Sequence, residues 1–329
     1  MTSVNFFPYQ SYNLTFGGFE VQIDNTFDAL VELNSTRFNF LKNNFWDKSF
    51  DYDIAHFWGL GTLNFESIKM AKYNNKKIVV TDLFPFFNHR FYISKYFGKL
   101  KSIHSILSYI DAIVVVSVEQ KKFLLKLGLV DSNKIYVIPN IVGRSFFNLD
   151  VSRTTFDNYL ICVGNICQRK NQLNIAKAVI NSELKLVFVG KCIGEDSFYA
   201  KEFSKLVRNS TNIEWYNNVE PNSSELVSLI SRSRGLILPS LSETQPISLL
   251  EAIVLNKPVL TSNLPFGKQS IFSNAFLTSN ILNPKKLAID LVYFWNNSDK
   301  YIVDIDKNQF SSNLVATQYI NLYEKIVSQ

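Results

Sequence analysis

Two glutamates eight positions apart, Glu243 and Glu251, enclose a short turn and the start of a helix. The apolar run Gly235–Ser240 precedes them, so the order indicates a buried strand, a turn and a helix that begins at Pro246. Proline suits a first helical position because the amide that it lacks would have no partner there. The amides that follow also lack helical acceptors, and helix starts of this kind bind phosphate.

The two carboxylates complement those amides, since each can accept two hydroxyl hydrogen bonds. Amides for a phosphate and carboxylates for hydroxyl groups predict a pocket for a nucleotide sugar. Two carboxylates at this spacing are common by chance, so the prediction depends on their place after a strand and over a helix start. The amides in question are those of Ile247, Ser248 and Leu249.

The second half of the chain alternates between strands and helices that position this pocket. Near-continuous apolar strands between amphipathic helices predict a parallel sheet covered on both faces. Ligands of such sheets lie beyond the carboxyl ends of the strands, where Gly164, Gly190 and Glu243 fall. The expected strands are 158–164, 184–190, 212–216, 236–239 and 258–262, and the expected helices are 171–180, 197–207, 223–231 and one from 246. Asn222 is the expected cap of the helix at 223–231.

The first half shows the same alternation with weaker signals. We expect two Rossmann-like halves that face each other across a ligand cleft, and the polar stretch 144–156 is the predicted junction. The expected strands are 4–8, 54–57, 77–81, 112–116 and 135–138, with a helix at 21–33.

The bulk properties are those of a two-domain globular enzyme. The chain has 329 residues, of which 47% are hydrophobic and 19% charged. No apolar run reaches the roughly 18 residues that span a bilayer, and the start has no basic flank of the kind that signal peptides carry. Cys162, Cys167 and Cys192 are odd in number and lack metal-ligand spacing, which indicates reduced thiols. We therefore expect a cytoplasmic protein.

The net charge of +6 is spread over both halves, and no recognition motif for nucleic acid accompanies it. Between Asp82 and Asp111 there is no acidic residue, and basic side chains alternate with aromatic ones. Such a segment can lie on an anionic membrane surface, and a helix with its aromatic face in the core is the alternative. The residues are Arg90, Lys95, Lys99 and Lys101, with Phe91, Tyr92, Tyr96 and Phe97.

A metal ion is one way to neutralise the negative charge of a bound phosphate, and the two carboxylates of an Asp-x-Asp triplet can hold such an ion. The two triplets in this chain, 51–53 and 304–306, do not lie beside the predicted pocket. Arg169, Lys170 and the amides after Pro246 are better placed, because preorganised donors stabilise a developing negative charge. We therefore expect no metal, while a solvated loop is the alternative for the two cations.

A series of motifs follows in order along the chain. These are Gly17–Glu20, Asp53–His56, Asp111–Ser117, Ile138–Asn140, Val163–Asn165, Arg169–Gln172, Phe188–Gly190, the Glu243 and Glu251 pair, and Pro258–Leu260. Their order and spacing resemble the retaining glycosyltransferases of family 4, over most of the chain and most strongly from Tyr159 to Asn263. The sequence departs from the family at Asn165, where many relatives carry arginine, and in the Thr-Gln-Pro turn after Glu243, where many carry a glycine-rich turn.

The resemblance implies an α/β protein with the GT-B fold, in which two Rossmann-like domains face each other across a cleft. It implies an acceptor-binding domain at 1–148, a donor domain at 149–309, and a C-terminal helix at 310–329 that crosses back onto the first domain. The implied activity is a retaining, metal-independent transfer of a sugar from a UDP- or GDP-linked donor to a hydroxyl of a glycan or lipid-linked glycan. Surface polysaccharide or glycoconjugate biosynthesis is the implied setting, with no cofactor.

The resemblance also implies roles for single residues. His56 would face the transferred sugar, although a lone histidine at a strand end is often a core residue, and Glu243 would contact that sugar. Lys170 and Arg169 would hold the diphosphate, and Glu251 the ribose. The implied donor-binding set is Gly18, Gly164, Asn165, Arg169, Lys170, Gly190, Val219, Glu243, Thr244, Gln245, Pro246, Ile247, Ser248 and Glu251.

Two other functions stay open at this point. A nucleotide-sugar epimerase can share the GT-B architecture without needing a separate acceptor, and it would return a sugar nucleotide as product. A non-catalytic subunit that supports a partner transferase is the second alternative. The presence of His56, Lys170, Glu243 and Glu251 speaks against it.

Overall fold

The computed structural model of the chain contains two compact α/β units. Met1–Ile141 and Gln309–Gln329 form the first unit, and Val142–Asn308 form the second. The structure describes residues 1–14, 16–33, 36–44, 46, 48–60, 62–82, 105–128, 130–149, 157–194 and 197–329. The division lies a few residues before the expected boundary at 148, and the last helix belongs to the first unit.

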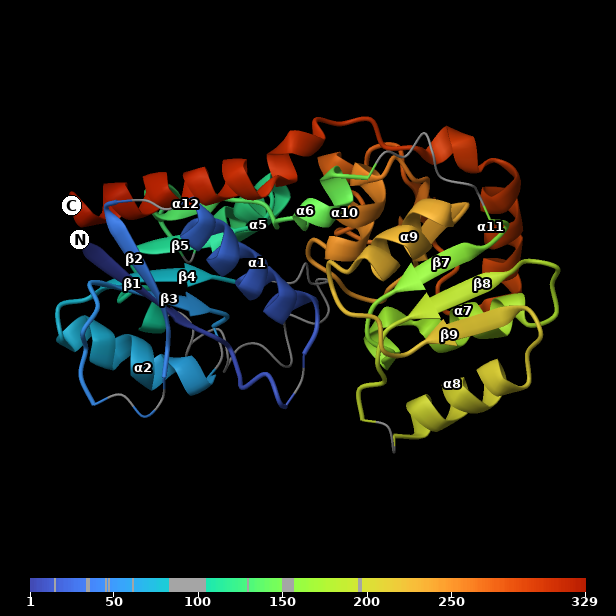
Figure 1. The fold of residues 1–329 in the computed structure, drawn as a ribbon, viewed down its shortest axis with the longest axis horizontal. Coiled ribbons are helices and arrows are strands. Elements are labelled where there is room, and N and C mark those ends of the chain that lie inside the picture. Colours follow the sequence, from blue (N-terminus) through green and yellow to red (C-terminus); the bar gives the residue numbers. More distant parts are fainter. Residues whose placement is uncertain are drawn as a thin grey trace. The chain divides into compact units, whose positions relative to one another are not determined.

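Within these residues, the first unit holds a six-stranded parallel sheet in the order β2-β1-β3-β4-β5-β6. Strands β1 to β5 of this sheet are labelled in Figure 1. Its strands are β1 (Thr2–Phe7), β2 (Phe38–Lys42), β3 (Ile54–Trp58), β4 (Lys77–Thr81), β5 (Ala112–Val115) and β6 (Ile135–Val137). Its helices are α1 (Gly18–Glu32), α2 (Thr62–Tyr73), α5 (Val118–Leu127) and α12 (Ser312–Val327).

Both faces of this sheet are covered, which explains why all five residues of β3 are buried. Alternate residues of a strand point to opposite faces. Ile54 and Trp58 therefore join the core beneath α1 and α12, whereas Ala55 and Phe57 join the core beneath α2 and α5. The last helix, although more than 170 residues after β6, supplies buried side chains such as Tyr323 to the first of these cores.

The second unit, again counted over the described residues, holds six parallel strands in the order β12-β11-β10-β7-β8-β9. Its strands are β7 (Leu160–Val163), β8 (Leu186–Val189), β9 (Ile213–Tyr216), β10 (Gly235–Leu238), β11 (Val259–Ser262) and β12 (Phe276–Thr278). Its helices are α6 (Arg144–Phe147), α7 (Gln172–Val179), α8 (Phe198–Arg208), α9 (Ser224–Arg232), α10 (Ile247–Val254) and α11 (Pro284–Asn296).

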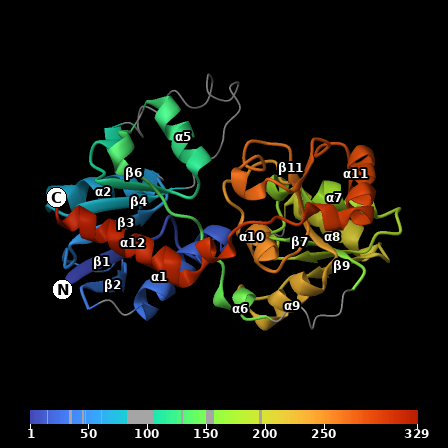
Figure 2. The same ribbon diagram turned by 90° about the horizontal axis from the view of Figure 1, so that it is seen from above.

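The strand order reverses between β7 and β10, because β7 pairs with both β8 and β10. This is the doubly wound order of dinucleotide-binding sheets, which bind ligands at the carboxyl ends of the strands where the order reverses. In one group of helices α7 contacts both α8 and α11, and in the other α6, α9 and α10 contact one another (Figure 2). The predicted parallel sheet with helices on both faces is therefore confirmed.

Some predictions need correction or lie outside the described residues. Asn222 was expected to cap α9, but Ser223 does so by accepting from the Leu226 amide, while Asn222 adopts a left-handed conformation with φ of 58°. The basic and aromatic segment from Arg90 to Lys101 lies outside the described residues. Along the described stretches, none of the helices has both the length and the apolar character needed to cross a bilayer.

Candidate functional site

The carboxyl ends of β7 and β10 place two loops side by side at the point where the strand order reverses. The loop after β7 contains a short 3₁₀ helix at Gln168–Lys170, and the loop after β10 leads to α10. The Leu241 amide donates to the Arg169 carbonyl at 2.8 Å. The Arg169 guanidinium in turn donates to the Ser242 carbonyl at 2.9 Å. Arg169 thus joins the two loops through its backbone and its side chain.

Glu243 forms ion pairs with both cations of the first loop. Its Oε2 lies 2.8 Å from Nη1 of Arg169, and its Oε1 lies 2.9 Å from Nζ of Lys170. The side chains of Glu243 and Lys170 are only 8% and 12% exposed, whereas that of Arg169 is 52% exposed. Burial raises the pKa of Glu243, but the charges and hydrogen bonds of Lys170 and Arg169 outweigh it and lower the pKa overall. Glu243 is therefore ionised at neutral pH.

Glu251, on α10, differs from Glu243 in its electrostatic state. It is 4% exposed, and burial raises its pKa to about 8, with Lys170 offsetting the effect only in part. At neutral pH most of its carboxyl groups are protonated. A protonated carboxyl group can donate one hydrogen bond and accept others, which suits it to a ligand hydroxyl.

Gly164 and Gly190 allow the backbone to approach closely at the edge of this cluster. Gly164 has φ of +141°, and a Cβ there would lie 3.1 Å from Cε of Lys170. Gly190 has φ of +140°, and a Cβ there would lie 2.4 Å from the Gly164 carbonyl oxygen. Both positions therefore require glycine, for conformation and for space. The indole of Trp215 donates to the Gly190 carbonyl at 2.9 Å and braces this end of β8.

Two amide side chains brace the loops, a role that the sequence interpretation did not assign. Gln172 donates to the carbonyls of Gly164 and Asn165 at 3.3 and 2.9 Å. Asn171, with φ of 66°, donates to the carbonyls of Pro239 and Ile281 at 3.0 and 2.7 Å. Both residues belong to the motif that was recognised, but only the folded chain shows which carbonyls they reach.

The start of α10 differs in one respect from the expectation. Pro246 precedes the first helical residue as the N-cap instead of occupying it, and the Leu249 amide donates to the Pro246 carbonyl at 3.1 Å. This amide is therefore not free, because the first turn closes on itself. The amides of Ile247 and Ser248 find no acceptor within the described chain. Gln269 donates to the Thr244 carbonyl and so holds the turn before the helix.

His56 lies in the core of the first unit. Its side chain is 0% exposed, and its ring nitrogens lie 2.7 Å from the Tyr323 hydroxyl and 2.8 Å from the Thr81 hydroxyl. Burial lowers its pKa to about 3, so the ring is neutral. These are the surroundings of a packed core residue, the alternative that the sequence left open. The catalytic role of His56 stays a prediction.

The remaining predicted residues are Gly18, in the first unit, and Val219, in the second. Gly18 begins α1 in the first unit, and a Cβ there would meet nothing within 4 Å. The Glu20 carboxylate accepts from the Gly17 amide at 2.9 Å and caps that helix start. Val219 is half-buried in the loop after β9. Within the second unit, the structure therefore brings together Arg169, Lys170 and Glu243 of the β7 and β10 loops, whereas Gly18 and His56 belong to the first unit.

One aspartate of each Asp-x-Asp triplet accepts a hydrogen bond from a backbone amide. The Asp53 carboxylate accepts from the Ser3 amide at 2.8 Å, and that of Asp306 accepts from the Asn308 amide at 3.0 Å. Among the residues described, no three His, Cys, Asp or Glu side chains gather in a way that could hold a metal ion.

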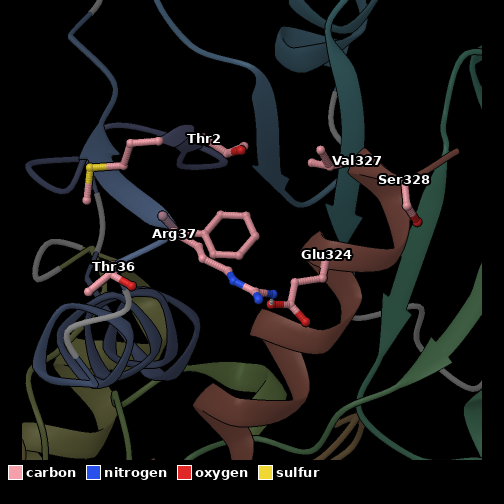
Figure 3. Close-up of a pocket in the computed structure, with 8 residues that line it drawn as sticks. Thr2, Thr36, Arg37, Glu324, Val327 and Ser328 are labelled. Atoms are coloured by element: carbon pink, nitrogen blue, oxygen red, sulfur yellow. Dashed lines mark hydrogen bonds and ion pairs between the residues drawn. The ribbon is translucent and has the colours of Figure 1, made fainter.

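A surface pocket occurs in the first unit, at the amino ends of β1 and β2 beside the end of α12 (Figure 3). Arg37 and Glu324 line it and form an ion pair of 2.6 Å with each other. Ligands of parallel sheets bind at the carboxyl ends, which is the opposite edge of this sheet. The pocket therefore does not compete with the β7 and β10 loops as the candidate site.

Comparison with known proteins assigns the second unit to a family. Residues 150–308 match the family model Glycosyl transferases group 1, so this part of the chain carries a domain of that family. The O-antigen chain mannosyltransferase RfbU of Salmonella typhimurium is 29% identical over 207 residues, covering 61% of this chain and 56% of the relative. The chain thus spans little more than half the length of that curated relative.

Solved structures resemble the whole chain. Sucrose-phosphate synthase from Thermosynechococcus elongatus has a TM-score of 0.74 and 12% identity, covering 100% of both chains. HepE from Anabaena, in complex with UDP and glucose, has a TM-score of 0.68 and 13% identity, again covering 100% of both chains. At such identities the likeness concerns the fold alone. The predicted GT-B fold, with two Rossmann-like domains, is confirmed.

Proposed function

We propose that this chain is a glycosyltransferase that moves a sugar from a nucleoside diphosphate sugar to a hydroxyl group of an acceptor. The observation that carries the proposal is the ion-pair cluster of Arg169, Lys170 and Glu243 at the point where the strand order of the second unit reverses. Two cations suit a diphosphate, and an adjacent carboxylate suits sugar hydroxyls. The family match over residues 150–308 supports this assignment.

The cationic residues of the site interact with the diphosphate, and the glutamates interact with hydroxyl groups of the donor. When the bond between the sugar and the diphosphate breaks, negative charge develops on the leaving group. Lys170 and Arg169 stabilise that charge, helped by the amides at the start of α10, and preorganised donors of this kind contribute a few kcal/mol each. Glu251 holds the ribose hydroxyls, and Glu243 orients the sugar. We propose that the reaction retains the configuration of the sugar and needs no metal, as in family 4.

The donor is proposed to carry UDP or GDP. HepE, which shares the fold, is described in complex with UDP and glucose, whereas RfbU is described as a mannosyltransferase. The acceptor is proposed to be a glycan or a lipid-linked glycan of surface polysaccharide biosynthesis, because RfbU is named for the O-antigen chain. Peripheral contact with a membrane through the segment from Arg90 to Lys101 belongs to the same proposal.

The test is a screen of UDP- and GDP-linked sugars, with EDTA present, that measures thermal stabilisation and slow donor hydrolysis. Glu243→Ala is the test variant. Glu183→Ala is the control, because Glu183 is exposed and precedes β8, at the opposite edge of the same sheet. We expect one donor class to stabilise the wild type and the control, and both to hydrolyse it while Glu243→Ala does not.

Three other results would contradict parts of the proposal. Recovery of an altered sugar nucleotide instead of free nucleotide indicates an epimerase. Failure of every nucleotide to stabilise the wild type indicates a non-catalytic subunit. Donor hydrolysis that stops with EDTA and returns with Mg²⁺ contradicts the metal-independent mechanism while leaving the transferase assignment intact.

A further inference from the structure

The ion pairs of Glu243 raise a question about the order of events in the site. Its two carboxylate oxygens lie 2.8 and 2.9 Å from the nitrogens of Arg169 and Lys170. The proposed function assigns these same nitrogens to the donor's diphosphate and assigns Glu243 to the sugar. The two assignments compete, because a diphosphate that reaches the nitrogens must take the place of the carboxylate on them.

Of the three side chains, Glu243 is the one that can leave with least rearrangement. Arg169 is tied to the second loop through its backbone carbonyl and its guanidinium. Lys170 is 12% exposed, and its side chain runs along Gly164, where no Cβ intervenes. The ion pairs are the only polar contacts that the described chain gives the Glu243 carboxylate. Rotation of the Glu243 side chain alone would therefore break both ion pairs.

The charges of the cluster favour such an exchange. With Glu243 in place, Arg169, Lys170 and Glu243 together carry one net positive charge, so a diphosphate would also face a nearby carboxylate. With Glu243 turned away, two positive charges face the diphosphate. The low exposure of Lys170 and Glu243 makes both interactions stronger than they would be in water.

We propose that Glu243 is an internal competitor for the donor's diphosphate. It pairs with Arg169 and Lys170 before the donor arrives, leaves them when the sugar offers hydroxyl groups, and returns to them once the sugar has been transferred. The hydroxyl groups of the intact donor's sugar donate hydrogen bonds to the Glu243 carboxylate and so replace the lost ion pairs. The product nucleoside diphosphate has no sugar and cannot replace them. Glu243 therefore favours the donor over the product and promotes product release. This inference rests on the proposed function.

The experiment measures the affinity of Glu243→Gln for UDP, GDP and inorganic pyrophosphate by calorimetry. Pyrophosphate presents the diphosphate chemistry whatever base the donor carries. Glutamine keeps the shape of the side chain but removes the charge that competes for the cations. Each of these ligands that binds the wild type should bind Glu243→Gln roughly tenfold more tightly. The affinity for UDP- and GDP-linked sugars should increase less, because the variant loses the carboxylate that accepts hydrogen bonds from the sugar hydroxyls.

Glu183→Gln is the matched control, since it changes the net charge by the same amount at the opposite edge of the same sheet. Its affinities should equal those of the wild type. An equal gain in both variants would show a general charge effect and overturn the inference. Glu243→Asp is the second test variant if the glutamine variant does not fold. Its shorter carboxylate should not span both cations, so pyrophosphate binding should again tighten.

The outcomes separate this inference from the proposed function. If the wild type binds none of the three ligands, the proposed function itself fails. If the wild type binds them and the Glu243 variants bind equally or more weakly, the proposed function survives and the inference is wrong. In that case Glu243 serves to hold Arg169 and Lys170 in position for the diphosphate.

Discussion

Gly190 and Gly164 touch at the carboxyl ends of β8 and β7, where a Cβ on Gly190 would lie 2.4 Å from the Gly164 carbonyl oxygen. A Cβ atom cannot lie that close to a backbone oxygen, and Gly190 also has φ of +140°, which favours glycine. The contact therefore forces the loop that carries Arg169 and Lys170 to move whenever Gly190 gains a side chain.

Gly190→Ala should lower donor binding and cost on the order of 1–3 kcal/mol of unfolding free energy, the range for strain at a special backbone conformation. Calorimetry with the donor and urea unfolding measure the two effects. Gly18→Ala is the control for stability, because a Cβ on Gly18 would meet nothing within 4 Å. A Gly190→Ala protein with wild-type stability and wild-type donor affinity would contradict the proposed packing.

Lys170→Met should reduce kcat/KM for the donor by roughly 10²–10³, because it removes a buried cation from the leaving group. It should also destabilise the protein, since of the two ion-pair partners of Glu243 just Arg169 then remains. The double variant Lys170→Met with Glu243→Gln should recover much of that stability without recovering activity. Urea unfolding and steady-state kinetics of the single and double variants separate the two effects.

Recovery of activity in the double variant would mean that Lys170 acts only by neutralising Glu243. Equal stability of the wild type and Lys170→Met would mean that the ion pair contributes little in the folded protein. Either result would require a different account of the two loops.

His56→Gln tests whether His56 contributes to catalysis or to the core. Its ring nitrogens contact the hydroxyls of Tyr323 and Thr81 in a fully buried environment. The variant should therefore lose on the order of 1–3 kcal/mol of stability, while turnover per folded molecule changes little. A turnover loss of several orders of magnitude at unchanged stability would favour the catalytic role that the sequence suggested.

The pH dependence of that variant gives a second measurement. Burial lowers the pKa of His56 to about 3 in the folded state, from 6.5 when exposed. Between these values the unfolded chain binds the proton and the folded chain does not, so wild-type stability falls as pH falls. The stability difference between the wild type and His56→Gln should shrink by up to about 1.4 kcal/mol per pH unit below pH 6.

His56 also shows where the sequence stops being informative. Its strand was predicted well, because the residues of β3 on either side of His56 are apolar. What covers a strand, however, is decided by distant residues. Here the cover is Tyr323, which is 267 positions away. No local pattern reports such a contact, so a core histidine and a catalytic histidine look alike in the sequence.

The same reasoning explains which strands were found. β7 and β10 lie inside a sheet with helices on both faces, so their sequences are apolar throughout and easy to recognise. The missed strands, β2 and β12, lie at sheet edges and are not fully buried, and β12 has only three residues. At the candidate site, the positions of Arg169, Lys170 and Glu243 followed from the motifs, but their ion pairs required the folded loops.

Glu251→Gln should change the pH dependence of stability in the direction opposite to that of His56→Gln. Burial raises the pKa of Glu251 from 4.5 to about 8 in the folded state. Between these values the folded chain keeps a proton that the unfolded chain has lost, so wild-type stability falls as pH rises. Glutamine is neutral throughout, so the variant should not lose stability in this way. As pH rises across this window, its free energy of unfolding relative to that of the wild type should increase by up to about 1.4 kcal/mol per pH unit.

Urea unfolding of the wild type and Glu251→Gln at intervals from pH 5 to pH 9 provides the measurement, with Glu183→Gln as the control for the loss of one charge at the surface. Adding the donor should reduce the difference if its hydroxyl groups supply hydrogen bonds to the Glu251 carboxylate. A difference that stays constant across the whole range would mean that Glu251 is ionised in the folded protein. The carboxylate would then need more stabilisation than Lys170 gives it, since the charge of Lys170 offsets the effect of burial on the pKa of Glu251 only in part.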